Sequence, residues 1–143
     1  MLPDTWHGVW RGSLALQPPL KNFPTTSLME LRITPKDSTR STWIIAYSGQ
    51  PERIYELVGS PEKPSTFVMD EKNGIMLDAT LEDNELLSTF EVEGRLLLTR
   101  YTLLPIGLRY KTQTFIKGAL GSQKVASWKQ TSLQSALLKR VGG

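Results

Sequence analysis

The sequence predicts an all-β protein, a single up-and-down antiparallel β-barrel of about eight to ten strands. Two observations predict this fold class. Apolar and polar residues alternate with a period of two along almost every segment. Turn residues interrupt the chain at intervals of about eight to twelve positions, as in all-β sandwiches and barrels.

The size and composition indicate one folded domain, residues 1–143. The chain is long enough to bury a core without disulfides, and it contains no cysteine. Apolar residues make up 39% and charged residues 22%, which excludes a wholly disordered chain. We interpret the net charge of +3 as small and spread along the chain, so we expect no nucleic-acid partner.

The alternating segments and the turns between them define the predicted strands. The predicted ranges are 8–17, 27–35, 41–48, 53–59, 66–71, 75–82, 85–93, 95–104, 108–117 and 122–131. The final segment SLQSALLKRV has Leu133 and Leu137 four positions apart, with Lys139 and Arg140 in what would be its last turn. This pattern predicts a short C-terminal helix.

Tight turns fix the register of neighbouring strands, because loop length decides which residues face each other. A three-residue loop with Lys72 and Asn73 in a type I turn and Gly74 left-handed, two-residue loops at 83–84 and 93–94, and a four-residue loop at 104–107 all agree on one inward face. The predicted pairs are Met69–Leu77, Phe67–Ala79, Leu81–Leu86, Leu77–Phe90, Phe90–Leu97, Leu86–Tyr101, Leu103–Leu108 and Tyr101–Tyr110. Upstream we expect Met29, Leu31 and Ile33 opposite Tyr47, Ile45 and Trp43, and Tyr55 and Leu57 opposite Tyr47 and Ile45.

A meander of about ten twisted strands with one apolar face tends to close, because closure buries that face and removes exposed edges. An open sandwich is the alternative. The first strand carries Gly8-Val9-Trp10-Arg11-Gly12. This Gly-x-Trp-x-Gly motif resembles the calycin superfamily, in particular its lipocalin-like and nitrobindin-like small barrels. The resemblance implies that Trp10 plugs one end, with Lys129 or Arg140 stacked on it.

The chain also departs from parts of that superfamily. The segment PPLKNFPTT is too short for the helix pair of the fatty-acid-binding proteins. Nitrobindin-type barrels bind heme through a histidine near the C-terminal end, whereas the single histidine here is His7. We therefore expect no heme and no other cofactor.

The register places small and mostly hydroxylic side chains in the middle inward row, namely Ala79, Ser88, Thr99 and Thr112. Large branched side chains would be needed there to pack the barrel solid. The sequence therefore predicts a pocket for a small, partly apolar ligand of unknown identity. The predicted ligand-binding residues are Trp43, Tyr47, Tyr55, Phe67, Ser88, Phe90, Thr99, Tyr101, Tyr110 and Thr112. The alternative is that Trp10, Trp43 and Tyr47 fill this space.

The same register gathers four apolar side chains on the outer face, Leu87, Leu96, Leu98 and Phe115. Such a cluster predicts a covered surface. Either the C-terminal segment covers it through Leu133 and Leu137, or a second copy covers it in a two-fold dimer. An interaction module without a ligand is therefore an alternative function.

Catalytic and metal-binding side chains are scarce. One histidine and no cysteine leave no His/Cys metal cluster, so we expect no metal. The carboxylates fall mostly in turns and on the outer face, so no catalytic residue is predicted and an enzyme is the less favoured class. The remaining enzymatic alternative is a calycin-type cyclase or isomerase with Tyr101 and Tyr110 as proton donors. No apolar stretch approaches the roughly 18 residues of a membrane helix, and no signal segment is visible, which together predict a cytoplasmic location.

Overall fold

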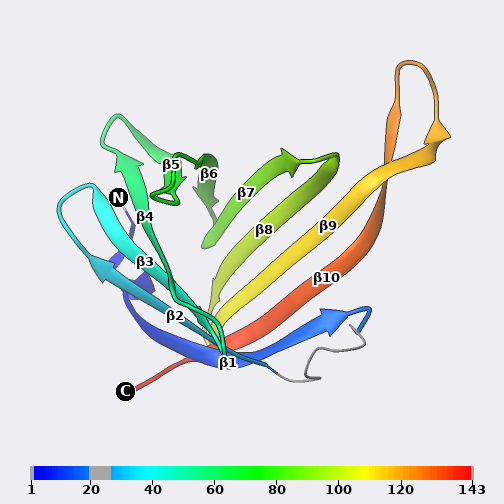
Figure 1. Ribbon diagram of the computed structural model, residues 1–143. Helices are drawn as coiled ribbons and strands as arrows, with labels where there is room; N and C mark the ends of the chain where they lie inside the picture. The colour runs from blue at the N-terminus through cyan, green and yellow to red at the C-terminus, as the bar shows by residue number, and fades with distance from the viewer. Residues whose placement is uncertain (1, 20–26, 143) are drawn as a thin grey trace.

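Ten antiparallel strands form a closed up-and-down barrel in the computed structural model, which describes residues 2–19 and 27–142 (Figure 1). Each strand pairs with its neighbours in the sequence, and β1 closes the barrel by pairing with β10. The strands are β1 (Gly8–Gln17), β2 (Ser27–Pro35), β3 (Arg40–Tyr47), β4 (Arg53–Ser60), β5 (Lys63–Asp70), β6 (Met76–Glu82), β7 (Glu85–Val92), β8 (Arg95–Leu104), β9 (Gly107–Gly121) and β10 (Ala126–Arg140). The predicted fold class is confirmed, and the open sandwich is excluded.

A single 3₁₀ turn, η1 (Asp4–Trp6), precedes the first strand. Among the residues that the structure describes, no helix is long and apolar enough to cross a membrane.

The alternation of side chains in the sequence becomes the two faces of the barrel wall. On β2, Met29, Leu31 and Ile33 are fully buried, whereas Glu30 and Arg32 between them form an ion pair on the outside. Strands β3 and β4 repeat the pattern, with Trp43 and Leu57 pointing inward. The apolar core is therefore the inner lining of the barrel.

The predicted tight turns set the register as expected. Asp83 and Asn84 have φ of 51° and 64°, and Glu93 and Gly94 have φ of 48° and 78°, so two-residue loops join these hairpins. Two details are wrong. Lys72 has φ of 65° and does not lie in a type I turn, and Leu104 pairs with Gly107, so the loop predicted as four residues has only two, Pro105 and Ile106. Of the pairs predicted along these hairpins, Met69–Leu77, Phe67–Ala79, Leu81–Leu86, Phe90–Leu97, Leu86–Tyr101, Tyr101–Tyr110 and Leu103–Leu108 are all present.

Predicted residue pairs differ from the structure between two pairs of strands. Between β6 and β7 the ladder ends at Ala79 and Ser88, so Leu77 does not pair with Phe90. Between β3 and β4, Tyr55 faces Trp43 instead of Tyr47, and Leu57 faces Ser41.

The second difference has a local cause. Pro51 has no N–H group to continue a ladder, and Gly49 has φ of 75°, so the β3–β4 connection is a wide loop. Because the shift is an even number of residues, every inward side chain stays inward.

The predicted C-terminal helix is wrong, since residues up to Arg140 continue strand β10. Leu133 and Leu137, which suggested a helical period, both lie on the outer face of this strand. Ala136 and Leu138 lie on its inner face and are buried opposite Tyr110 and Leu108. A helix in place of β10 would leave β1 and β9 as exposed edges and would remove the ladders that β10 forms with both. Closure of the barrel therefore favours a strand over the weak local helical pattern.

Candidate functional site

One end of the barrel is filled by the N-terminal segment. Trp10 is 3% exposed, and its indole N–H donates a hydrogen bond to the carbonyl of the fully buried Trp6 at 3.1 Å. The guanidinium of Arg140 lies 4.2 Å from the centre of the Trp10 ring and donates hydrogen bonds to the carbonyls of His7 and Thr5. The plugged end thus has Arg140 as the stacked cation.

The glycines of the Gly-x-Trp-x-Gly motif make this arrangement possible. A side chain on Gly8 would collide with the guanidinium of Arg140, and one on Gly12 would collide with the backbone of β10 at Leu137. The other candidate cation, Lys129, lies far along β10, where it pairs with Ile116. It therefore does not stack on the plug.

The other end of the barrel is hollow. A cavity of about 380 Å³ begins beyond the plug, at Leu14 and Leu16 of β1, and reaches the surface at the exposed Gln50 and Arg53. Its volume lies at the lower end of the range for small-molecule sites. The alternative that aromatic side chains fill this space is wrong: Trp10 belongs to the plug, and Trp43 and Tyr47 line the cavity as walls.

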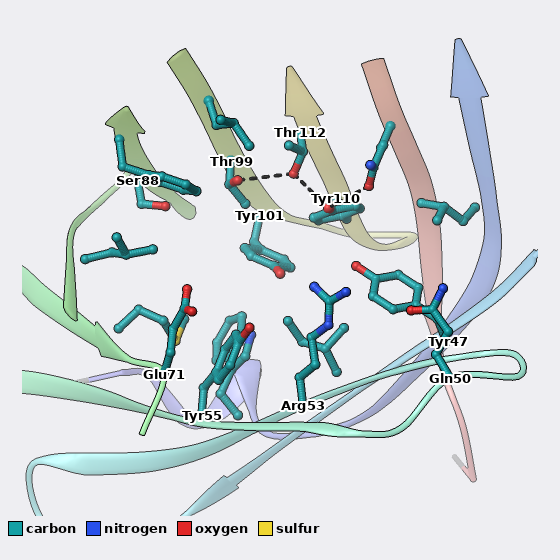
Figure 2. A pocket seen from close by; sticks show the side chains of 18 of the residues that line it. Tyr47, Gln50, Arg53, Tyr55, Glu71, Ser88, Thr99, Tyr101, Tyr110 and Thr112 are labelled. Atoms are coloured by element: carbon teal, nitrogen blue, oxygen red, sulfur yellow. Dashed lines mark hydrogen bonds between the residues drawn. The ribbon is translucent and has the colours of Figure 1, made fainter. Parts of the chain in front are cut away.

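Nine of the ten predicted ligand-binding residues line this cavity; they are Trp43, Tyr47, Tyr55, Ser88, Phe90, Thr99, Tyr101, Tyr110 and Thr112 (Figure 2). The exception is Phe67, whose ring packs against Gly59 in the β4–β5 hairpin and is 2% exposed. Gly59 in turn bonds to Thr39 beside the β2–β3 turn, at the plugged end. An inward-facing side chain therefore does not always line the cavity, because its position along the barrel axis also decides whether it reaches the cavity.

Several lining residues were not predicted. Arg53, Gln50 and Glu71 lie at the ends of strands or in loops, where alternation gives no face. Gln134 was assigned to a helix and lies instead on the inner face of β10, opposite Thr112. Its signal was the two-residue spacing with Ala136 and Leu138, which the helical interpretation obscured.

Two hydroxyl groups of the predicted row, those of Thr99 and Thr112, belong to a hydrogen-bonded chain across three strands (Figure 2). The Oγ1 atoms of Thr99 and Thr112 are 3.1 Å apart, Thr112 donates to the phenol oxygen of Tyr110 at 2.7 Å, and Tyr110 donates to Oε1 of Gln134 at 3.3 Å. Since the amide oxygen of Gln134 only accepts, each hydroxyl donates to the next group toward Gln134, and Thr99 must donate to Thr112. Both lone pairs of the Thr99 hydroxyl are then available to accept hydrogen bonds from a molecule in the cavity.

The opposite wall is formed in part by Trp43. Its ring meets the Tyr101 ring edge to face, with centroids 5.0 Å apart at 80°. The indole N–H of Trp43 is buried and has no acceptor among the residues that the structure describes, and the same holds for the N–H of Trp6 in the plug. An unpartnered indole N–H therefore occurs at both ends of the barrel and does not by itself indicate a ligand.

All four tyrosines of the chain line the cavity. Burial is the main cause that raises the pKa of each of them, most strongly for Tyr101. They are therefore neutral hydrogen-bonding groups at physiological pH. A raised pKa also makes Tyr101 and Tyr110 weaker acids, which speaks against proton donation by these two residues at neutral pH.

His7 lies at the plugged end, away from the cavity. Its Nε2 is 3.2 Å from Oγ of the buried Ser41, and its Nδ1 is 3.5 Å from the exposed carboxylate of Asp4. This order of acid, imidazole and hydroxyl resembles a hydrolytic triad. Ser41 does not line the cavity, however, so these contacts fasten the N-terminal segment to β3. Within residues 2–19 and 27–142, no group of three or more candidate ligands is placed to hold a metal ion.

The outer cluster of Leu87, Leu96, Leu98 and Phe115 lies on β7, β8 and β9, with Leu96 directly opposite Phe115. All four side chains are half-buried. A polar chain lies beside them, in which Glu85 pairs with Arg100, Arg100 donates to Gln113, and Gln113 donates to Gln130. The C-terminal segment does not cover the cluster, because it is a strand of the wall beside it.

The fold and the site define a closed antiparallel barrel that is plugged at one end and hollow at the other. The chain matches no protein-family model, no curated protein and no solved structure.

Proposed function

We propose that the protein is a calycin-type barrel that binds a small, partly apolar molecule in its cavity. The observation that carries the proposal is the cavity of about 380 Å³, which reaches the surface and is lined by the hydroxyl groups of Ser88, Thr99 and Thr112. Thr99 and Thr112 are hydrogen-bonded to each other, and Thr99 can accept a further hydrogen bond from a molecule in the cavity. A solid core would have no use for hydroxyl groups at these positions.

Apolar walls complete the site. Ile45, Leu77, Phe90 and Leu97 also line the cavity. A ligand with an apolar body and polar ends fits this distribution, since mostly apolar walls with few polar groups are typical of small-molecule sites.

The test is Thr99→Leu, which fills the cavity without disturbing the outer face. We expect the affinity for N-phenyl-1-naphthylamine, a neutral fluorophore that brightens in apolar sites, to fall by about tenfold or more. The matched control is Thr102→Leu, the same substitution on the outer face of the same strand, where Thr102 pairs with Glu85 and Arg109. An unchanged titration in a folded Thr99→Leu variant would remove the cavity as the binding site.

A further inference from the structure

We propose that the ligand carries an acidic group, which Arg53 binds at the mouth of the cavity. This inference rests on the proposed function and specifies its substrate class. Arg53 is the first residue of β4 and faces Ile45 of β3. Its side chain extends into the cavity between Tyr55 and Tyr47, and its guanidinium lies 5.4 Å from the centre of the Tyr47 ring (Figure 2).

The guanidinium of Arg53 has no anionic partner among the described residues. Four other arginines of the barrel, Arg11, Arg32, Arg40 and Arg100, each form an ion pair with a carboxylate. Arg53 forms none with any residue in the described part of the chain. Glu71 lines the same cavity but lies on the far side of Tyr55 (Figure 2). The mouth therefore presents an uncompensated cation on one side, held in place by an aromatic ring.

The position of Arg53 orients the ligand. Its acidic group lies at the mouth, and its body contacts Ile45, Leu77 and Leu97. The site thus fits an amphiphilic organic acid. Arginine binds planar carboxylates and similar oxyanions through paired hydrogen bonds, which favours this class over a neutral ligand of the same shape.

The test uses two fluorophores that share one ring system, 1-anilinonaphthalene-8-sulfonate and the neutral N-phenyl-1-naphthylamine. The sulfonate stands in for the acidic group. We expect Arg53→Gln to weaken the sulfonate probe by about tenfold or more and to change the affinity for the neutral probe by less than about twofold. Arg53→Lys should retain part of the difference, because it keeps the charge and loses the paired donors. The matched control is Arg109→Gln, which removes the same charge from the outer face.

The outcomes distinguish failure of the proposed function from failure of the acidic group alone. If neither probe binds the unaltered protein, the proposed function fails. If both bind and Arg53→Gln changes them equally or not at all, only the acidic group is overturned. Glu71→Gln distinguishes a zwitterionic ligand: we expect it to leave the sulfonate affinity equal or higher, whereas a ligand that also needed Glu71 for a cation would lose affinity.

A second inference comes from the distribution of charge along the chain. The net charge suggested an even distribution, but the charges are unevenly distributed. Residues 1–93 contain all fourteen Asp and Glu residues and eight Lys and Arg residues, for a formal charge of −6. Residues 94–143 contain nine Lys and Arg residues and no acidic residue, for a formal charge of +9. Strands β8, β9 and β10 are therefore a basic wall of the barrel.

The hairpin of β9 and β10 projects beyond this wall (Figure 1). Strand β8 pairs with β9 only as far as Ile116, and β1 pairs with β10 only as far as Leu133. Among the described residues, residues 117–128, here called the arm, therefore pair only with each other. The arm begins beside Arg95 and the β7–β8 turn, at the open end of the barrel. A two-stranded hairpin exposed on both faces is only marginally stable in water, which favours a partner for the arm.

The surface of the arm identifies that partner. Leu120 and Val125 at the tip are 82% and 62% exposed, and Lys117, Lys124 and Lys129 are exposed around them. Apolar side chains at a tip surrounded by lysines are complementary to a lipid bilayer with anionic headgroups. We propose that the arm docks the open end of the barrel on an anionic membrane surface.

Co-sedimentation with vesicles tests this second proposal. We expect the full chain to bind phosphatidylcholine vesicles that contain phosphatidylserine, and to bind pure phosphatidylcholine vesicles much more weakly. Lys124→Gln should reduce the partition coefficient about fivefold, and Leu120→Ser should reduce it about tenfold. The matched controls are Lys63→Gln, at the plugged end, and Ile54→Ser, an exposed apolar residue on the opposite wall.

Three results would overturn membrane docking. One is equal binding to both kinds of vesicle. Another is an arm-dependent dimer in sedimentation velocity without vesicle binding, which would make a second copy of the chain the partner. The third is arm-dependent binding to duplex DNA in place of vesicles, which would make nucleic acid the partner.

Discussion

The two ends of this barrel are built on the same strands and differ in how far the interior is filled. At the plugged end Trp6 and Trp10 are buried, and the Trp10 N–H has an acceptor. At the open end Trp43 is equally buried, and its ring is a wall of the cavity; its N–H, like that of Trp6 in the plug, has no acceptor among the described residues. The two ends therefore differ in how far side chains fill the interior and not in the burial of their tryptophans. The comparison teaches that the pleat decides which residues face inward, whereas side-chain volume decides whether that interior is core or site.

Trp10→Ala should have the largest effect on this comparison. Removing the plug deletes a large buried side chain, its hydrogen bond to Trp6 and the platform for Arg140, so we expect the free energy of unfolding to fall by about 3–5 kcal/mol. Urea denaturation followed by circular dichroism measures the change. Because this variant risks not folding, Trp10→Phe and Trp43→Phe form a milder pair.

Of these two milder variants, only Trp10→Phe loses a hydrogen bond present in the structure, so it should be the less stable by about 1 kcal/mol. Equal stability of the two variants would break the comparison between the ends.

High pH should have the next largest effect on stability, and it should act on the open end of the barrel. All four tyrosines line the cavity, and burial raises the pKa of each above its value in the unfolded chain. Their neutral forms therefore contribute stability that is complete below about pH 10 and is lost as the pH rises toward the folded-state values. The slope is about 1.4 kcal/mol per pH unit for each phenol that ionises only on unfolding.

The measurement is a pH titration of ultraviolet tyrosinate absorbance together with circular dichroism. Most of the absorbance should appear together with unfolding, and the half-buried Tyr55 should ionise first. Tyr101→Phe should make the loss of stability with pH less steep. Full ionisation of all four phenols in a folded barrel would show that the cavity is open to water.

These residues also show how much of the molecule could be predicted from the sequence. Thr99, Thr112 and Tyr110 were placed in neighbouring inward positions from turn lengths alone, because a given loop position and length leave one register for a hairpin. The hydrogen-bonded chain that joins them follows from that register.

Other features had no signal of this kind. Arg53 and Glu71 lie next to loops, where the pleat no longer specifies a face, and the height of Phe67 along the barrel depends on strand tilt. Gln134 was missed because Leu133 and Leu137 fit both periods, and only closure of the barrel distinguishes a strand from a helix there. The position of a residue along the barrel axis and the strand pairing that closes the barrel both depend on contacts between distant segments. They could therefore not be predicted from one segment at a time.

Leu98→Glu should have the smallest effect, and it extends the comparison to the outside of the wall. Leu98 is half-buried beside the polar chain of Arg100 and Gln113, whose long side chains cover part of the apolar surface. A glutamate at this site would remain solvated and lie near the Arg100 guanidinium. We therefore expect the free energy of unfolding to change by less than about 0.5 kcal/mol and the sedimentation coefficient to stay the same. A shift from a dimer to a monomer in this variant would instead identify the outer cluster as a two-fold interface, since two introduced carboxylates would then face each other across it.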